Sequence, residues 1–176
     1  MLHLAVEEFG LRPLVFHVDG GWNSELGVHN IQVMVDKLGL DLYTEVINWE
    51  EMKAFQLALF KAGVPYLDNV QDLAFVTAVD NYANKYHIRY ILNGGNYSSE
   101  FMSYPLKYYY YGTDMRFIKD ILRKFCDNKM ETYPFGSVFR RKIWLKYIKR
   151  VNTFKMLNYI PYNVENAKKL LNEEYG

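Results

Sequence analysis

Short apolar runs alternate along the chain with longer stretches in which apolar residues recur at helical spacing. Three runs, over residues 14–18, 42–47 and 88–92, are rich in β-branched and aromatic side chains and predict strands. The first run is nearly continuous in its apolar character, which is typical of a strand buried on both faces of a parallel sheet. The alternation with helices predicts an α/β fold built on a doubly wound parallel sheet.

Helical spacing of apolar residues predicts helices before, between and after these strands. Asn48 has the position of a helix N-cap, and Glu51 has the spacing that would complete a capping box with it. The helix over residues 139–151 is expected to carry one apolar stripe between basic positions. The expected helices cover about residues 2–9, 24–38, 48–62, 68–86, 114–125, 139–151 and 164–171.

Two of the predicted strands end in glycine pairs. These turns consist of Val18, Asp19, Gly20 and Gly21 after the first strand, and of Gly94, Gly95 and Asn96 after the third. Doubly wound sheets bind ligands outside the carboxyl ends of their strands, where glycine lets the backbone approach a ligand closely. The two turns therefore predict a nucleotide site along one edge of the sheet.

The net charge of +1 hides a division of charge along the chain. Residues 1–100 contain 6 Lys or Arg and 13 Asp or Glu, a balance of −7, and residues 101–176 contain 15 and 7, a balance of +8. We expect a partial nucleotide-binding domain over residues 1–100 and a basic, aromatic-rich, mainly helical extension over residues 101–176 packed on it. The basic part indicates an anionic ligand or partner, or it neutralises the acidic part, and both interpretations stay open.

Composition excludes several classes of protein. The chain has no apolar run of about 18 residues, which a transmembrane helix requires, and no signal peptide pattern at its start. Its single cysteine, Cys126, excludes an internal disulfide and a zinc site built from cysteines alone. A cytoplasmic setting is expected from these features.

Four stretches together carry a family resemblance: "LRPLVFHVDGGWNSELGVHNIQVMVDKLGLDLYTEVINWEEMK", "GVPYLDNVQD", "YILNGGNYSSE" and "LNYIPYN". They resemble the N-acetyl sugar amidotransferases of the PP-loop ATP-pyrophosphatase superfamily, which serve the synthesis of lipopolysaccharide O-antigen and nine-carbon sugar acids. The motifs occur in the family's order, and the resemblance extends over residues 2–175.

The resemblance implies an adenine nucleotide alpha-hydrolase-like fold and an ATP- and Mg²⁺-dependent reaction. ATP would adenylate the acetamido oxygen of a nucleotide-linked N-acetyl sugar, and ammonia from a glutaminase and cyclase-like partner would then displace AMP and leave an acetamidino group. The turn at residues 18–21 would contact adenine, and the turn at residues 94–96 would close the nucleotide site. Nucleic acid is not an expected partner.

Further residues are candidates within this hypothesis. Asp72 and Glu100 are the acids nearest the family-like motifs and are candidates to hold Mg²⁺ on ATP, although Asp72 can instead stabilise the first turn of its helix. Lys107 can contact the sugar nucleotide or fill a core. Asp19 can bind the ribose, shape its turn or cap a helix, and Trp22 can line the pocket or serve packing.

The chain departs from the family pattern at one decisive place. The S-G-G-x-D-S loop that grips pyrophosphate does not occur in residues 1–176, and neither does G-x-G-x-x-G or the Walker pattern. We therefore expect an interior piece of a longer protein, truncated at both ends. We also expect it not to hydrolyse ATP alone, because losing several charge-assisted hydrogen bonds weakens phosphate binding by orders of magnitude.

Two other functions remain open. The chain can belong to another PP-loop enzyme, such as one that modifies tRNA, or it can be a non-catalytic binding remnant of the fold. The basic helix around residues 140–150 has four interpretations. It binds an anionic sugar donor, docks the ammonia-supplying partner, lies on a nucleic acid or membrane surface, or forms a solvated face that neutralises the acidic part.

Overall fold

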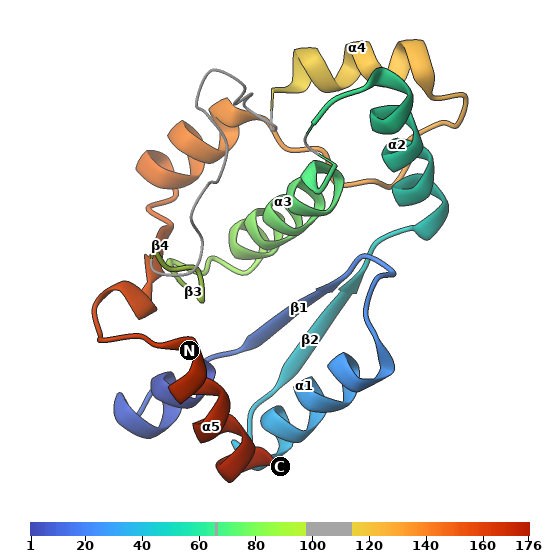
Figure 1. The fold of residues 1–176 in the computed structure, drawn as a ribbon. Coiled ribbons are helices and arrows are strands. Elements are labelled where there is room, and N and C mark those ends of the chain that lie inside the picture. The colour runs from blue at the N-terminus through green and yellow to red at the C-terminus, as the bar shows by residue number, and fades with distance from the viewer. Residues whose placement is uncertain (66, 98–113) are drawn as a thin grey trace.

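The computed structural model describes residues 1–65, 67–97 and 114–176 as a mixed α/β structure (Figure 1). Its elements, in chain order, are η1 (Leu4–Glu8), β1 (Val15–Asp19), α1 (Glu25–Lys37), β2 (Leu42–Val46), α2 (Trp49–Ala62), α3 (Asn69–Lys85), β3 (Tyr90–Asn93), α4 (Met115–Phe125), η3 (Arg140–Ile148), β4 (Asn152–Lys155), η4 (Met156–Asn158) and α5 (Val164–Tyr175). η1 and η3 are π-helical, and η4 is a single 3₁₀ turn.

Local sequence signals explain where several helices begin and end. The Ser24 hydroxyl accepts a hydrogen bond from the Gly27 N–H, and the Asn48 side chain accepts from the first N–H groups of α2. These polar caps satisfy backbone donors that have no partner inside the helix. Gly63 ends α2 in the left-handed conformation, with φ of 66°, which confirms the predicted stop.

The strands form two separate parallel pairs within the described residues. β1 pairs with β2 from Val15↔Leu42 to Asp19↔Val46, and β3 pairs with β4 from Tyr90↔Asn152 to Asn93↔Lys155. All three predicted strands exist, and their parallel pairing is confirmed. A single sheet is not what these residues form, since β3 pairs with β4 rather than with β1 or β2.

The strand β4 was not predicted from the sequence. All four of its residues are exposed, and only Phe154 among them is apolar. A strand whose side chains do not enter a core shows no apolar period, so its pairing is decided by the neighbouring backbone of β3 and not by its own side chains. The predicted helix over 139–151 accordingly ends earlier, and Arg150 adopts a left-handed φ of 56° just before β4.

The hydrophobic core lies between helices rather than on the faces of a sheet. Met52, Phe55 and Leu59 of α2, all predicted to be inward, are buried against α3 and α4. The strands reach this core mainly at their carboxyl ends, through Val18 and Ile47. The remainder of β1 is only half-buried, so the expected burial of this strand on both faces is wrong for the described residues.

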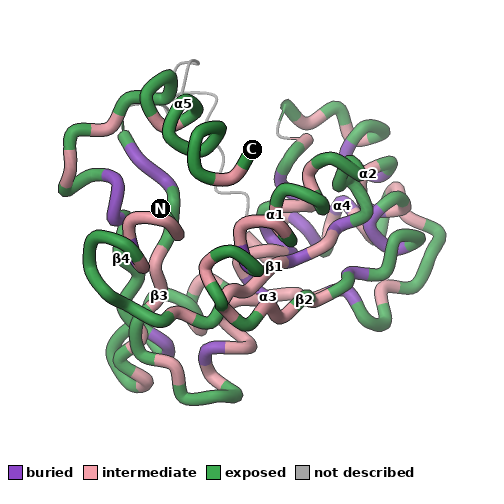
Figure 2. Tube along the Cα trace, turned by 90° about the horizontal axis from the view of Figure 1, so that it is seen from below, coloured by how far each residue is buried: buried purple, intermediate pink, exposed green. Residues whose placement is uncertain are grey.

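Two predicted helices bury less than their apolar stripes indicate. α5 has no buried residue, and Figure 2 shows it almost wholly as exposed. It contacts the rest of the chain through a hydrogen bond between His3 and Tyr175 and another from the Lys37 ammonium to the Glu174 carbonyl. η3 likewise buries only Leu145.

Elements on both sides of the predicted boundary at residue 100 pack together. α2 packs on α4, and β3 pairs with β4. The boundary itself falls among residues 98–113, outside the described residues, so the division into two parts stays a prediction. No helix in the described part of the chain combines the length and the apolar character that crossing a membrane requires.

Candidate functional site

The turn after β1 is held by the side chain of Asp19. One Asp19 carboxylate oxygen accepts hydrogen bonds from the Gly21 N–H at 2.8 Å and from the Asn23 amide at 2.9 Å. Gly21 has φ of +84°, a conformation that costs an L-residue about 1–2 kcal/mol. Asp19 thus shapes the turn, and its contact with a ribose stays a prediction.

Two exposed indole rings lie at this turn. A Cβ placed on Gly21 would lie 2.6 Å from Cε3 of Trp49, so the Trp49 ring packs directly on the glycine backbone. The Trp22 and Trp49 rings meet edge to face with centroids 4.9 Å apart, and the two residues are 58% and 38% exposed. The turn therefore carries an open aromatic surface.

This surface lies at the carboxyl ends of two neighbouring strands. The Ile47 N–H, just after β2, donates to the Asp19 carbonyl at 2.8 Å. Trp49 follows two residues later at the start of α2, which places it against the β1 turn. Gly20 fixes the turn to the core, because a Cβ there would lie 3.3 Å from Met52 Cε and 3.4 Å from Phe75 Cε1.

The turn after β3 uses the same local device. The Asn93 side-chain oxygen accepts from the Gly95 N–H at 2.6 Å, as Asp19 accepts from Gly21. Gly95 and Asn96 are buried, and the following Tyr97 N–H donates to the Asn158 side chain at 2.9 Å. A Cβ placed on Gly94 would lie 3.9 Å from Met1 Sδ, so the amino-terminal residue lies beside this turn.

The described residues do not join the two turns in one sheet. The β1 turn belongs to the β1–β2 pair, and the turn at residues 94–96 belongs to the β3–β4 pair. In Figure 1 the arrowhead of β1 points toward α2, whereas β3 lies beside β4 on the other side of the view. The predicted sharing of one ligand by both turns stays a prediction.

Of the remaining candidate residues, the structure describes Asp72 but not Glu100 or Lys107. Asp72 lies in the first turn of α3, one helical turn before Phe75, whose ring contacts the β1 turn. Partial burial of its carboxyl group and the neighbouring Asp68 carboxylate raise the pKa of Asp72. Glu100 and Lys107 lie outside the described residues.

The residues at the β1 turn fit one part of a nucleotide better than another. Exposed indoles beside a glycine backbone offer a flat apolar surface on which a purine can stack, a contact worth about 1–3 kcal/mol per base. Within residues 1–65, 67–97 and 114–176, no group of three or more His, Cys, Asp or Glu side chains could hold a metal ion. Among the described residues, none is assigned to Mg²⁺ or to phosphates.

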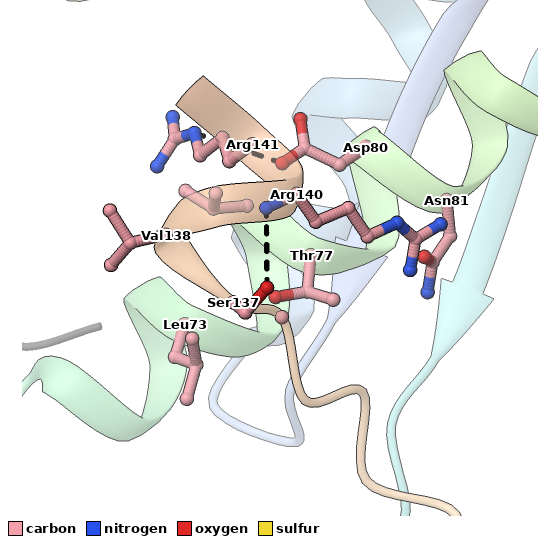
Figure 3. Close-up of a pocket in the computed structure, with 10 residues that line it drawn as sticks. Leu73, Thr77, Asp80, Asn81, Ser137, Val138, Arg140 and Arg141 are labelled. Atoms are coloured by element: carbon pink, nitrogen blue, oxygen red, sulfur yellow. Dashed lines mark hydrogen bonds and ion pairs between the residues drawn. The ribbon is translucent and has the colours of Figure 1, made fainter. Parts of the chain in front are cut away.

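A small hollow lies elsewhere, between α3 and the start of η3 (Figure 3). Ser137 caps η3 by accepting from the Arg140 N–H, the Arg140 side chain extends toward Asn81, and Arg141 forms an ion pair with Asp80 at 3.7 Å. The volume of the hollow is about 10 Å³, enough for about one water molecule. It is therefore a packing feature and not a ligand site.

Trp49 was missed as a site residue by sequence reasoning, although a signal was present. It follows the second predicted strand almost at once, and the carboxyl ends of adjacent parallel strands meet at one edge of a sheet. The exposed aromatic next to a cap could thus have been placed beside the first glycine turn.

No protein family, no curated protein and no solved structure was found that matches this chain.

Proposed function

We propose that the rim formed by the β1 turn, Trp22 and Trp49 binds the purine of an adenine nucleotide. The observation that carries this proposal is a pair of exposed indoles in edge-to-face contact at the carboxyl ends of β1 and β2, of which Trp49 packs over Gly21. The two rings form a contiguous apolar surface that is accessible to a ligand, and such a surface can mark a binding site. Ligands of parallel α/β sheets bind at this end of the strands.

The doubly wound sheet is part of the same proposal. In such sheets the first strand lies in the middle, with the second and third on one side and the fourth and fifth on the other. The pairs β1–β2 and β3–β4 would form the two sides, and in Figure 1 the β3–β4 pair lies to the left of the β1–β2 pair. One further parallel strand between β1 and β3 would complete that order.

An isolated pair of parallel strands also argues for such a strand. Parallel sheets occur with both faces covered, and two-stranded sheets have little stability of their own. β1 is rich in apolar residues, as a central strand would be, yet it is only half-buried. A strand between the pairs would pair with the open edge of β1 and would place the turns after β1 and β3 along one rim.

The reaction class rests on the sequence resemblance. We propose an ATP-dependent amidotransferase that converts a sugar acetamido group to acetamidino through an adenylated intermediate, with ammonia supplied by a partner glutaminase. The loop that this class uses for pyrophosphate is not among residues 1–176. Nucleotide binding, and not turnover, is therefore the property that tests the proposal on this chain.

Titration of the chain with AMP, while tryptophan fluorescence is followed, tests the base site. Stacking on Trp49 or Trp22 is expected to quench the emission saturably, and Trp49→Ala is expected to weaken AMP binding about tenfold or more, which corresponds to the loss of one stacking contact. Isothermal titration of the same proteins gives the affinity independently of the fluorophore.

Trp144→Ala is the matched control, because this third tryptophan lies on η3. AMP affinity is expected to be unchanged in this variant. UMP is expected to bind more weakly than AMP, since a pyrimidine offers less stacking surface. No saturable AMP binding, or equal loss in the Trp144 and Trp49 variants, would refute the purine site.

A further inference from the structure

The helix η3 turns an apolar stripe toward solvent. Phe139 and Tyr147 are 67% and 68% exposed, and the three apolar residues between and after them are exposed as well. The complete stripe consists of Phe139, Ile143, Trp144, Tyr147 and Ile148. In a π-helix the backbone hydrogen bonds join residues five apart, so side chains four and five residues apart lie near one another and these five side chains share one face.

The opposite face of η3 packs against the rest of the protein. Leu145 stands two residues from both Ile143 and Tyr147, which places it across the helix from the stripe, and it is only 3% exposed. On α3, Asp80 forms an ion pair with Arg141 at 3.7 Å. The orientation of η3 is thus set by contacts on its inner side, and the stripe is left outward.

Cations border the outward stripe. The Lys149 ammonium lies 5.7 Å from the ring centroid of Trp144, and the Lys146 ammonium lies 5.5 Å from that of Tyr147. Residues 139–155 contain seven Lys or Arg and no Asp or Glu. In Figure 1 this helix, drawn in orange, lies at the outer edge of the molecule just before β4. The surface is apolar at its centre and positively charged around it.

Aliphatic side chains in the stripe distinguish two anionic partners. Single-stranded nucleic acid would use aromatic rings for stacking, but Ile143 and Ile148 offer a base no stacking face. An anionic bilayer uses all of these groups, because aliphatic and aromatic side chains enter the acyl boundary while lysine ammonium groups stay with the headgroups.

We propose that η3 docks the protein on the surface of an anionic membrane. The stripe enters the interface, and Lys142, Lys146 and Lys149 contact the lipid phosphates. The helix lies in the plane of the surface and does not cross the bilayer. The proposal is independent of the nucleotide site, and its test is carried out without nucleotide.

Co-sedimentation of the full chain with phosphatidylserine-containing vesicles measures this binding. Vesicles of phosphatidylcholine alone are expected to bind much less. Replacement of the three lysines by glutamine, Lys142→Gln, Lys146→Gln and Lys149→Gln together, is expected to lower the partition coefficient by about a hundredfold, from about fivefold per charge. Three exposed lysines elsewhere serve as the matched control: Lys61→Gln, Lys129→Gln and Lys169→Gln.

Tryptophan emission separates insertion from simple charge attraction. A chain with Trp22→Phe and Trp49→Phe retains Trp144 as its only tryptophan. Its emission is expected to shift to shorter wavelength when anionic vesicles are added, because an inserted indole leaves water. Circular dichroism of each variant checks that the substitutions at exposed positions leave the fold intact.

Three results would overturn the proposal. The first is no binding to anionic vesicles at low ionic strength, and the second is binding without a Trp144 shift, which leaves charge attraction only. The third is equal loss of binding in the control lysine variant. Tight binding of a polyuridine oligonucleotide that depends on the same lysines, with no vesicle binding, would assign the surface to nucleic acid instead.

Discussion

The Glu51 carboxylate, in the first turn of α2, accepts hydrogen bonds from the backbone N–H and the hydroxyl of Thr132, 81 residues further along the chain. The Glu131 N–H donates to the same carboxylate at 2.7 Å. Glu51 is 7% exposed. Burial by itself would raise its pKa, but the hydrogen bonds from residues 131 and 132 outweigh burial and lower it. This side chain ties the segment after α4 to the start of α2.

Replacing Glu51 by glutamine is expected to destabilise the fold. Glu51→Gln removes the charge and one acceptor, so a buried N–H or hydroxyl at residues 131–132 loses its partner. The expected loss in the free energy of unfolding is about 1–3 kcal/mol. Urea denaturation measures it, with Glu50→Gln as control, since Glu50 is exposed and forms a local ion pair with Lys53. Equal denaturation midpoints for the two variants would contradict the prediction.

The contribution of Glu51 is also expected to depend on pH. Its folded-state pKa lies below its unfolded-state value of about 4.3, so the unfolded chain binds more protons in this range. The stabilisation is complete above that value and is lost as pH falls through the folded-state pKa. The difference in unfolding free energy between the wild type and Glu51→Gln should therefore shrink below about pH 4. A difference that stays constant or grows in acid would show that Glu51 is not the titrating group.

A side chain at Gly21 is expected to disrupt the aromatic rim. Gly21→Ala combines a left-handed φ with a Cβ 2.6 Å from Trp49, whereas Gly39→Ala meets the same kind of φ, +60°, with nothing within 4 Å. The control is expected to lose about 1 kcal/mol of stability, and Gly21→Ala more, because the Trp49 ring must move as well. Thermal unfolding measures the difference, and equal losses would mean that the ring contact contributes nothing.

The close approach of Gly136 to Thr77 is expected to couple the two positions. A Cβ on Gly136 would lie 2.5 Å from Thr77 Oγ1, and Thr77 is buried in α3. Gly136→Ala alone is expected to cost about 1–3 kcal/mol through overpacking. Thr77→Ala removes the two closest atoms, so the double variant should be more stable than the sum of the single losses predicts. A double-mutant cycle by urea denaturation measures this coupling, and strict additivity would contradict it.

The local features of the fold were predictable because short segments encode them. Asn48 caps α2, Gly63 ends it, and Met52, Phe55 and Leu59 recur at the spacing that buries one helical face. The two glycine turns were predicted for the same reason. The sequence did not predict the hydrogen-bond partners of Glu51. Capping-box spacing indicated Asn48, whereas the Glu51 carboxylate accepts hydrogen bonds from residues 131 and 132.

The sequence by itself determined where most helices and three strands lie, because caps, glycine stops and apolar periods act over a few neighbouring residues. Only the tertiary structure decided that β3 pairs with β4, that the stripe on η3 faces solvent, and that Trp49 covers Gly21. These relationships join residues far apart in the chain. They depend on which surfaces bury each other in three dimensions, and no local pattern carries that information.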